Sequence, residues 1–197
     1  MHVTKAKQAE ATKAKLERVA RELFAERGFA ELSAEELVAR AGVTRGALYH
    51  HYNGKEGLFE AVVEGAMKDV HAKLAAEAAG QADPLQGLLR GIHAFLNIST
   101  QPSIQRILLI DAPAVLGWHK WRKMDDRYGL GLLKRGLSSA MKTGLLRNQD
   151  VDVMAHLLQG ALTEAAMVIA RSKKPSKARK DAERALASII SGWRAED

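Results

Sequence analysis

Two helix starts follow one another closely near the N-terminus, and together they leave the surrounding chain little freedom. Ser33 and Thr44 each precede a helix-forming stretch, and each carries a hydroxyl that accepts hydrogen bonds from first-turn amides. Glu36 stands three residues after Ser33 and completes a capping box, which marks a helix N-terminus. Gly42 ends the first helix, since glycine is favoured just beyond a helix C-terminus. We therefore predict two short helices that cross at a steep angle across one glycine turn.

The second of these helices lacks the closed apolar face of a buried helix. The stretch from Val43 to Tyr52 carries arginine, threonine, tyrosine and histidine side chains that form hydrogen bonds. A tight turn followed by a polar second helix is typical of a helix-turn-helix, in which the second helix enters the DNA major groove. The pattern therefore predicts DNA binding. The residues expected to pack inside the motif are apolar: Leu37, Ala41, Val43 and Leu48.

Composition narrows the class of protein further. The chain has 197 residues and a formal net charge of +7, which favours an anionic partner, either nucleic acid or an anionic membrane surface. Proline occurs only four times among many alanines, leucines, glutamates, lysines and arginines, and this favours helices over sheet. The absence of cysteine excludes a disulfide framework and a thiolate metal site. We find no apolar run long enough to cross a bilayer and no signal peptide, so we expect a cytoplasmic protein without a membrane partner.

The rest of the chain also has helical patterning. Apolar residues recur at helical spacing through most of it, and no segment alternates as a strand does. We predict an all-α fold of about nine helices, preceded by a polar arm from Met1 to about Thr12 that frays. A long amphipathic helix should run from Lys55 to about Ala79, and the chain should loop from Gly80 to Pro84. Pro113 should break or kink the apolar segment around it.

The residues from Ser33 to Phe59 closely resemble the DNA-binding domain of the TetR family of bacterial regulators. The signature of that family is a capped helix, an Ala-Gly-Val turn, a short helix ending in Leu-Tyr-x-His-aromatic, and a Lys-Glu helix start. These elements stand here as Ala41-Gly42-Val43, Leu48-Tyr49-His50-His51-Tyr52 and Lys55-Glu56. One position departs from the pattern: Gly54 stands where the family often has a serine that caps the next helix, so Asn53 is an alternative cap.

The resemblance implies an architecture and a mechanism. Residues 1–54 correspond to a three-helix DNA-binding domain, with the motif at about 33–52, and residues 55–197 to a larger helical domain for effector binding and dimerisation. The implied protein is a homodimer whose two recognition helices lie about one DNA turn apart. It is implied to be a repressor that binds a palindromic double-stranded DNA operator and is released by a small-molecule effector. Because the long helix from Lys55 to about Ala79 reaches from one domain to the other, we expect it to act as the lever between them.

Several residues of the motif have chemistry suited to DNA. Arg45 lies in the first turn of the second short helix, where a guanidinium forks to O6 and N7 of guanine. The resemblance implies phosphate contacts for Tyr49, His50 and Lys55. His50 and His51 point in different directions on a helix, so we expect no shared metal. The predicted DNA-binding residues are Ser33, Thr44, Arg45, Gly46, Ala47, Tyr49, His50 and Lys55.

The effector pocket is predicted from large apolar or aromatic residues that have a few polar groups among them. Most of the apolar candidates have a second interpretation as packed core. His93, Asn97 and Asp111 stand among apolar residues and need partners if buried, so they either bind the effector or tie helices together. The pocket candidates are Met67, His71, His93, Asn97, Asp111, Trp118, Trp121 and Tyr128.

The last two helices carry wide apolar stripes, and the resemblance implies that they form a four-helix interface between two subunits. One face of each helix should serve the subunit's own core, and the other face should contact the partner. The predicted interface residues are Leu157, Leu158, Ala161, Ala165, Leu186, Ile189, Ile190 and Trp193.

Two functions other than specific regulation stay open from the sequence. One is a helical ligand carrier or enzyme without a role at DNA, and the other is a protein that binds DNA without sequence specificity. The chain contains no HExxH, P-loop or GxSxG motif and no acid pair at helical metal spacing. We therefore predict no catalytic residue, no metal site and no cofactor, and we prefer a transcriptional regulator.

Overall fold

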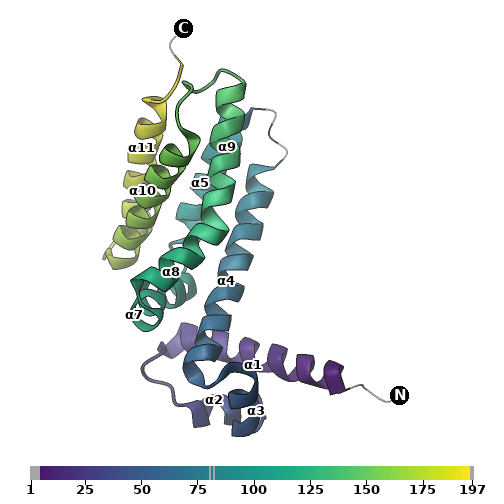
Figure 1. Ribbon diagram of the computed structural model, residues 1–197. Coiled ribbons are helices and arrows are strands. Elements are labelled where there is room, and N and C mark those ends of the chain that lie inside the picture. Colours follow the sequence, from purple (N-terminus) through teal and green to yellow (C-terminus); the bar gives the residue numbers. More distant parts are fainter. Residues whose placement is uncertain (1–4, 80, 82, 196–197) are drawn as a thin grey trace. The chain divides into compact units, whose positions relative to one another are not determined.

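The computed structural model describes residues 5–79, 81 and 83–195, and most of these residues lie in helices. The described residues form nine continuous helical runs and no strand, with an isolated bridge between Leu146 and Arg194 (Figure 1). The predicted all-α fold of about nine helices is therefore confirmed.

The helical runs have the following bounds, where η denotes a π-helical stretch within a run. They are α1 (Lys5–Arg27), α2 (Ala34–Ala41), α3 (Arg45–Tyr52), α4 (Lys55–Ala78), α5 (Pro84–Ile98), α6 with η1 and α7 (Pro102–Ile104, Gln105–Asp111, Ala112–Leu116), α8 with η2 and α9 (Trp118–Asp125, Asp126–Leu130, Gly131–Lys142), α10 (Val151–Arg171) and α11 (Pro175–Ser191).

The first helix begins earlier than the sequence suggested. We expected a fraying arm as far as about Thr12, but α1 is helical from Lys5, and only residues 1–4 of that arm lie outside the described residues. The segment from Lys5 to Ala11 consists of lysine, alanine, glutamine and glutamate, all good helix formers. Its polar surface therefore reflects a solvent-exposed helix and not an unstructured tail.

The chain folds into two compact units. Unit 1 consists of the residues up to Ala66 together with Pro102–Trp121, and unit 2 consists of Met67–Gln101 and the residues from Arg122 onward. The N-terminal half of α4 belongs to unit 1 and its C-terminal half to unit 2. These units describe packing, whereas the predicted boundary between residues 54 and 55 concerns function and stays a prediction.

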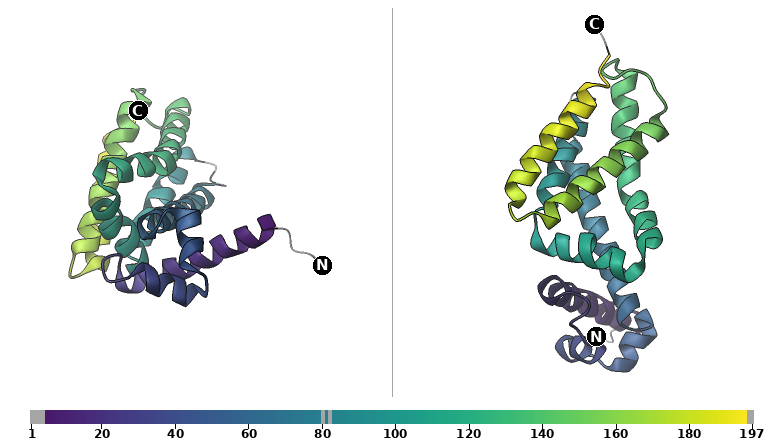
Figure 2. Two further views of the ribbon diagram at one scale, coloured as in Figure 1. Left: turned by 60° about the horizontal axis from the view of Figure 1, so that its bottom comes forward. Right: turned by 90° about the vertical axis from the view of Figure 1, so that its left-hand side faces the viewer.

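The core of unit 1 is aromatic where α1 and α4 meet. The rings of Phe24 and Phe59 pack edge to face with centroids 5.0 Å apart, and Phe29 lies 5.0 Å from Phe59. Leu37 and Leu48 bring α2 and α3 onto this core and are fully buried. Figure 2 shows α2 and α3 beside α1, as the packing of these helices requires.

The junction between α3 and α4 depends on a close approach of backbone. Asn53 ends α3 in the left-handed conformation (φ 57°), so it is the C-cap of α3 and not the cap of α4 that the sequence offered as an alternative. A Cβ at Gly57 would lie 1.7 Å from the carbonyl oxygen of Tyr52. Only glycine is compatible with this junction, which fixes how α4 leaves the motif.

The helical run around Pro113 changes its hydrogen-bonding register and does not break. The stretch Gln105–Asp111 is π-helical, and the amide of Ala112 donates to the carbonyl of Ile107. Pro113 then stands in the first turn of α7, where its missing amide hydrogen is tolerated. The wider π turn ahead of the proline lets the helix continue, so the predicted break is absent.

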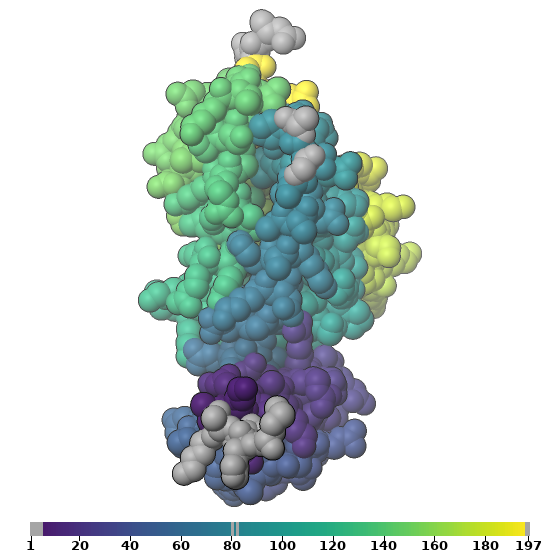
Figure 3. Space-filling view, turned by 90° about the vertical axis from the view of Figure 1, so that its right-hand side faces the viewer, coloured from purple at the N-terminus to yellow at the C-terminus, as the bar shows by residue number. Residues whose placement is uncertain are grey.

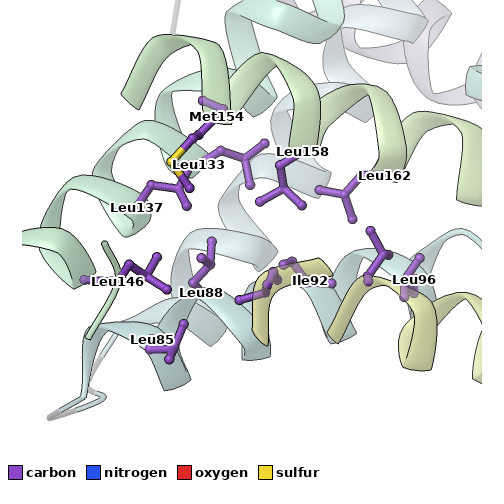
Figure 4. Packing of buried hydrophobic residues seen from close by; sticks show 14 of the residues in the cluster. Leu85, Leu88, Ile92, Leu96, Leu133, Leu137, Leu146, Met154, Leu158 and Leu162 are labelled. Carbon is purple, nitrogen blue, oxygen red and sulfur yellow. The ribbon is translucent and has the colours of Figure 1, made fainter. Parts of the chain in front are cut away.

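Unit 2 contains a bundle of α5, α9, α10 and α11. α5 packs on α9 and α11, and α10 packs on the same two helices, as Figure 2 shows for the neighbouring α10 and α11. Leucines dominate the shared core in Figure 4, where α5, α9 and α10 all contribute. Its labelled residues are Leu85, Leu88, Ile92, Leu96, Leu133, Leu137, Leu146, Met154, Leu158 and Leu162.

α4 is amphipathic in unit 2 and leaves one side at the surface. Met67 is buried, whereas Lys68, Asp69 and Lys73 are exposed. Figure 3 shows part of α4, in blue, at the surface of the molecule. The predicted long helix is therefore confirmed, with its end at Ala78 in place of Ala79. It is not amphipathic over its whole length, because the adjacent pairs Leu58–Phe59 and Val62–Val63 are all buried in its N-terminal half.

α10 is long and apolar enough to cross a membrane by length and composition. Our expectation that no apolar run reaches this size was therefore wrong. Half of its most apolar window is buried inside the structure, where it packs against α9 and α11. α10 is apolar on more than one side, because Leu158 and Leu162 are buried whereas Val153 and Leu157 are exposed, which explains how it meets the same criterion.

Candidate nucleic-acid interface

The two helices of the motif begin with the caps that the sequence predicts. Ser33 Oγ accepts from the amide of Glu36 at 3.1 Å, and the Glu36 carboxylate accepts from the amide of Ser33 at 2.9 Å. That backbone hydrogen bond, followed by one from Arg27, lowers the pKa of Glu36 to about 2. Thr44 Oγ1 accepts from the amide of Ala47 at 3.2 Å. The hydroxyls of both caps are therefore engaged as acceptors within the motif.

Arg45 lies at the start of α3 with its guanidinium in solvent. Its Nη1 is 2.7 Å from Oε1 of Glu35, and its guanidinium carbon is 5.4 Å from the ring centroid of Tyr49. The side chains of Arg45 and Glu35 are 62% and 60% exposed. Such an exposed pair is weakly held, so Arg45 is free to exchange its carboxylate partner for a nucleic-acid group.

The outward face of α3 carries further polar side chains. Tyr49 is 46% exposed, and His50 is exposed beside it. Gly46 is exposed as well, with no atom closer than 3.8 Å to the position of an added Cβ. These residues form one open surface together with Arg45, a shape that suits close approach to DNA.

Lys55 is placed differently from the prediction. Its Nζ donates to the carbonyl of Phe29 at 3.1 Å and to that of Leu32 at 2.8 Å, and it lies 3.9 Å from the centroid of the Phe29 ring. Two of the three ammonium donors thus hold the turn between α1 and α2. The sequence alone gave no sign of this contact, and it weighs against Lys55 as a phosphate ligand.

Tyr52 ties the motif back to α1. Its hydroxyl donates to Oε1 of Glu17 at 2.8 Å, and the burial of the ring is the first cause that raises the pKa of Tyr52. The structure therefore shows a partly buried Tyr52 that connects α3 to α1.

Three of the predicted pocket residues belong to unit 1. Asp111 accepts a hydrogen bond from the amide of Phe29 at 2.8 Å, so it ties two segments together, one of the two roles left open by the sequence. Trp121 is buried and donates from Nε1 to the carbonyl of Leu108 at 2.8 Å. Trp118 packs on Trp121 but is 59% exposed.

The other five predicted pocket residues belong to unit 2. His71 contacts the backbone carbonyl of Tyr128 through Nδ1, and Met67 is buried on the same helix as His71. His93 and Asn97 are exposed and lie 2.8 Å apart, with Nδ1 of His93 2.6 Å from a carboxylate oxygen of Glu183. His93 therefore ties α5 to α11, and Asn97 contacts His93 within α5. The sequence had placed both residues among apolar ones, but both are exposed.

One buried polar group in unit 2 escaped the sequence analysis. Asp125 accepts from Gln159 at 3.0 Å and from Thr163 at 3.4 Å, and Arg122 lies 3.5 Å from the same carboxylate oxygen. Burial raises the pKa of Asp125, while the Gln159 hydrogen bond and Arg122 oppose that shift. Gln159 is 4% exposed. Its side-chain amide oxygen, Oε1, has no hydrogen-bond partner among the described residues. Helical periodicity marks α10 as core and gives no signal for this group.

The predicted interface residues divide into three sets. Leu158, Leu186 and Ile190 are buried in the core of unit 2, because they face the bundle from their own helices. Leu157 is 63% exposed, and Ile189 is exposed as well. The first set serves the subunit's own core, and the second set is exposed to solvent. Ala161, Ala165 and Trp193 are partly buried against the core.

Two capped helices joined by a glycine turn, the second of which presents Arg45, Tyr49 and His50 to solvent, have the arrangement of a helix-turn-helix DNA-binding protein. A family profile described as "Bacterial regulatory proteins, tetR family" matches residues 18–62, and another described as "Tetracyclin repressor-like, C-terminal domain" matches residues 85–193. The chain belongs to the TetR family of bacterial transcriptional regulators, which bind DNA and are not enzymes.

Known relatives agree with this assignment. A solved TetR-family transcriptional regulator from Pectobacterium atrosepticum is 34% identical, with a TM-score of 0.87 over 98% of this chain and 99% of that one. The Tn10 TetC protein of Escherichia coli is 26% identical over 143 residues, which are 72% of this chain and 71% of that protein. RolR, solved with its ligand resorcinol, shares the fold at 21% identity, with a TM-score of 0.71 over 94% of this chain and 90% of that one.

Proposed function

We propose that this protein is a homodimeric transcriptional repressor that binds a palindromic operator through α3 and is released by a small-molecule effector. The observation that carries the proposal is the exposed face of α3, on which Arg45 lies beside Tyr49 at the capped end of the helix. A structural helix of this length would bury such a face, and here only Leu48 of α3 is buried. The repressor acts in the cytoplasm, where bacterial DNA is accessible.

The proposed division of labour follows the predicted boundary. Residues 1–54 bind DNA, with Arg45 reading a base, Tyr49 and His50 binding phosphates, and Thr44 placing the helix N-terminus near a phosphate. The small residues Gly46 and Ala47 let the backbone approach the base edges. Ser33 caps α2, the helix that precedes α3 in the motif.

Residues 55–197 bind the effector and a second subunit. The complex of RolR with resorcinol supports a small-molecule ligand in this fold, although the chemistry of the ligand need not be shared. α4 supports a role as the lever, because it supplies residues to both compact units. Among the predicted pocket residues of unit 2, Met67, His71 and Tyr128 fit an interior site best, since His93 and Asn97 are exposed.

An exposed apolar stripe supports the homodimer. Val153, Leu157 and Val168 are at least half exposed along α10, and Ile189 of α11 is 44% exposed. An added Cβ at Gly160 would meet nothing within 4 Å, so a partner helix has room to come close at this point of the stripe. A four-helix interface formed by α10 and α11 of two subunits would cover these side chains.

The experiment that tests this function starts from a random-sequence DNA duplex library, from which the full-length protein selects its binding sites. We expect an enriched palindrome that survives a large excess of bulk DNA in a gel shift. Arg45→Ala should weaken binding to that palindrome by about tenfold or more and relax one base position per half-site. Binding without any enriched sequence would establish the non-specific alternative, and no binding would favour the ligand carrier.

The effector is tested separately by native mass spectrometry of the purified protein. A co-purified small molecule bound to a dimer, with dissociation of the palindrome when that molecule is added back, would support release by the effector. DNA affinity that is unchanged by the recovered molecule would refute this part of the proposal.

A further inference from the structure

The turn between α1 and α2 is held by side chains that lie far along the chain. Arg106, in η1, donates from Nη2 to the carbonyl of Arg27 at 2.9 Å. Asp111, the last residue of η1, accepts through Oδ2 from the amide of Phe29 at 2.8 Å. The same Oδ2 lies 3.4 Å from Nε of Arg106. Arg106 and Asp111 therefore lie beside each other and form hydrogen bonds with two nearby backbone groups of one turn.

Gly28 leaves the space that the Arg106 side chain needs to form these hydrogen bonds. It has a φ of 83°, and a Cβ built on it would lie 2.0 Å from Nη2 of Arg106. The guanidinium therefore occupies the space that a side chain at position 28 would need. The turn and Arg106 are matched in shape as well as in hydrogen bonding.

The same turn is held from a second helix. Lys55, at the start of α4, donates to the carbonyls of Phe29 and Leu32. The next residue after Leu32 is Ser33, the N-cap of α2. The place where the motif begins is thus set by contacts with Lys55, Arg106 and Asp111, in addition to the packing of its apolar core.

The segment that carries Arg106 and Asp111 is connected to unit 2 at both ends. Pro102–Trp121 belongs to unit 1, whereas the residues before and after it belong to unit 2. The segment also lies inside the stretch 85–193 that matches the C-terminal domain of the family. The chain passes from one unit to the other at three points, within α4, before Pro102 and after Trp121. Two of these three points are the ends of the segment that binds the turn.

We propose that Arg106 and Asp111 are positioning residues for DNA binding, through which the state of unit 2 reaches α2 and α3 by a path separate from α4. This inference rests on the proposed DNA-binding function. Because coupling between two sites is reciprocal, DNA bound to α3 stabilises the contacts of Arg106 and Asp111, and loss of those contacts weakens DNA binding. The two residues touch backbone of the turn and need not touch DNA.

The test uses the full-length protein and the duplex that it selects from the random library. Hydrogen–deuterium exchange is measured with and without this duplex for peptides that cover residues 33–52 and 102–116, and DNA affinity is measured by fluorescence anisotropy. The variants are Asp111→Ala and Asp111→Asn, which keeps an acceptor for the Phe29 amide. Lys120→Ala is the matched control, since it removes another ion pair of the same segment, 2.6 Å long, with Glu60.

In the wild type and in Lys120→Ala, we expect DNA to slow exchange in both peptides. In Asp111→Ala, DNA should slow exchange in residues 33–52 but no longer in 102–116, and affinity should fall by about tenfold, as for the loss of one charge-assisted hydrogen bond. Asp111→Asn should lie between the two, and it replaces the alanine variant if that variant does not fold. A purely structural defect would instead speed hydrogen exchange in both peptides without DNA. DNA would then still slow exchange in both peptides together.

Wild-type binding to the duplex with no change of exchange in 102–116 would overturn the inference and leave the proposed function intact. Equal affinity of Asp111→Ala and wild type would also overturn it. If the library yields no bound duplex, the proposed function fails first, and the positioning role fails with it.

Discussion

The Nη1 atom of Arg45 lies 2.7 Å from Oε1 of Glu35, so the candidate base reader of α3 is paired with a carboxylate of the preceding helix. Both side chains are exposed, and a carboxylate at this position also repels approaching phosphates. The pair therefore holds Arg45 in place in the free protein and competes with DNA for it.

Glu35→Gln should raise DNA affinity by about two- to fivefold, because Arg45 loses its competing partner and the surface loses a negative charge. Anisotropy titrations with the selected duplex at low and high salt measure this effect. Glu22→Gln is the matched control, since it changes the charge equally but releases Arg18 of α1, 3.1 Å from Glu22. An equal gain in both variants would mean that net charge, and not Arg45, is responsible.

Lys55→Met should lower the free energy of unfolding by about 1–3 kcal/mol, because two backbone carbonyls lose a charged donor. Urea unfolding at neutral pH measures the change, with Lys142→Met on the exposed surface of α9 as the control. The salt dependence of DNA binding should stay close to that of the wild type. A shallower salt slope at unchanged stability would instead restore Lys55 as a phosphate ligand.

Gly57→Ala should prevent the junction between α3 and α4 from forming, because the new Cβ would lie 1.7 Å from the carbonyl oxygen of Tyr52. We expect a marked fall in melting temperature and loss of DNA binding. Gly65→Ala in the same helix meets no atom within 4 Å and should stabilise the protein by about 0.5–1 kcal/mol through helix propensity. Similar melting temperatures for the two variants would contradict the proposed close approach.

The capping box predicts a pH dependence. The pKa of Glu36 is lowered from 4.5 to about 2 by the Ser33 amide first and Arg27 second, so folding favours the ionised carboxylate. The resulting stabilisation is fully present above pH 4.5 and is lost as the pH falls toward 2. Urea midpoints should therefore fall more steeply between pH 6 and pH 3 for the wild type than for Glu36→Gln. Parallel curves for the two proteins would show that the charge of Glu36 contributes nothing.

Leu157→Asp should convert the proposed dimer into a folded monomer, because the side chain is 63% exposed in the single chain and an interface would bury the new charge. Sedimentation velocity at micromolar concentration measures the mass, and circular dichroism confirms the helical content. Lys142→Asp, at an exposed position at the end of α9, should remain a dimer. A wild-type protein that sediments as a monomer would refute the dimer itself.

The helix starts were predictable because their chemistry is local. Ser33 and Glu36 are three residues apart in the sequence, and their reciprocal hydrogen bonds need no distant partner. Thr44 and Ala47 form the second cap in the same way. The motif and its family follow from such short-range patterns, and so does the position of Arg45 on an open face.

Predictions from local sequence were less accurate where they depended on one feature, such as a polar segment or a single proline. The polar residues after Lys5 suggested a fraying arm, but their helix propensity carries α1 through them. Pro113 suggested a break or a kink, and the helix continues past it after a π-helical stretch. In both places the local signal was real, and a different backbone arrangement satisfied it.

The sequence by itself determined the all-helical class, the two capped helices of the motif and the residues available to read DNA. The tertiary structure decided which charged groups are engaged within the protein. Lys55 lies 26 residues from Phe29 in sequence, and Asp111 lies 82 residues from it, yet both bind the same residue of one turn. Helix caps and helical periodicity depend on residues that are close in sequence. The contacts of Lys55 and Asp111 with Phe29 depend on how distant segments pack, which helical periodicity does not reveal.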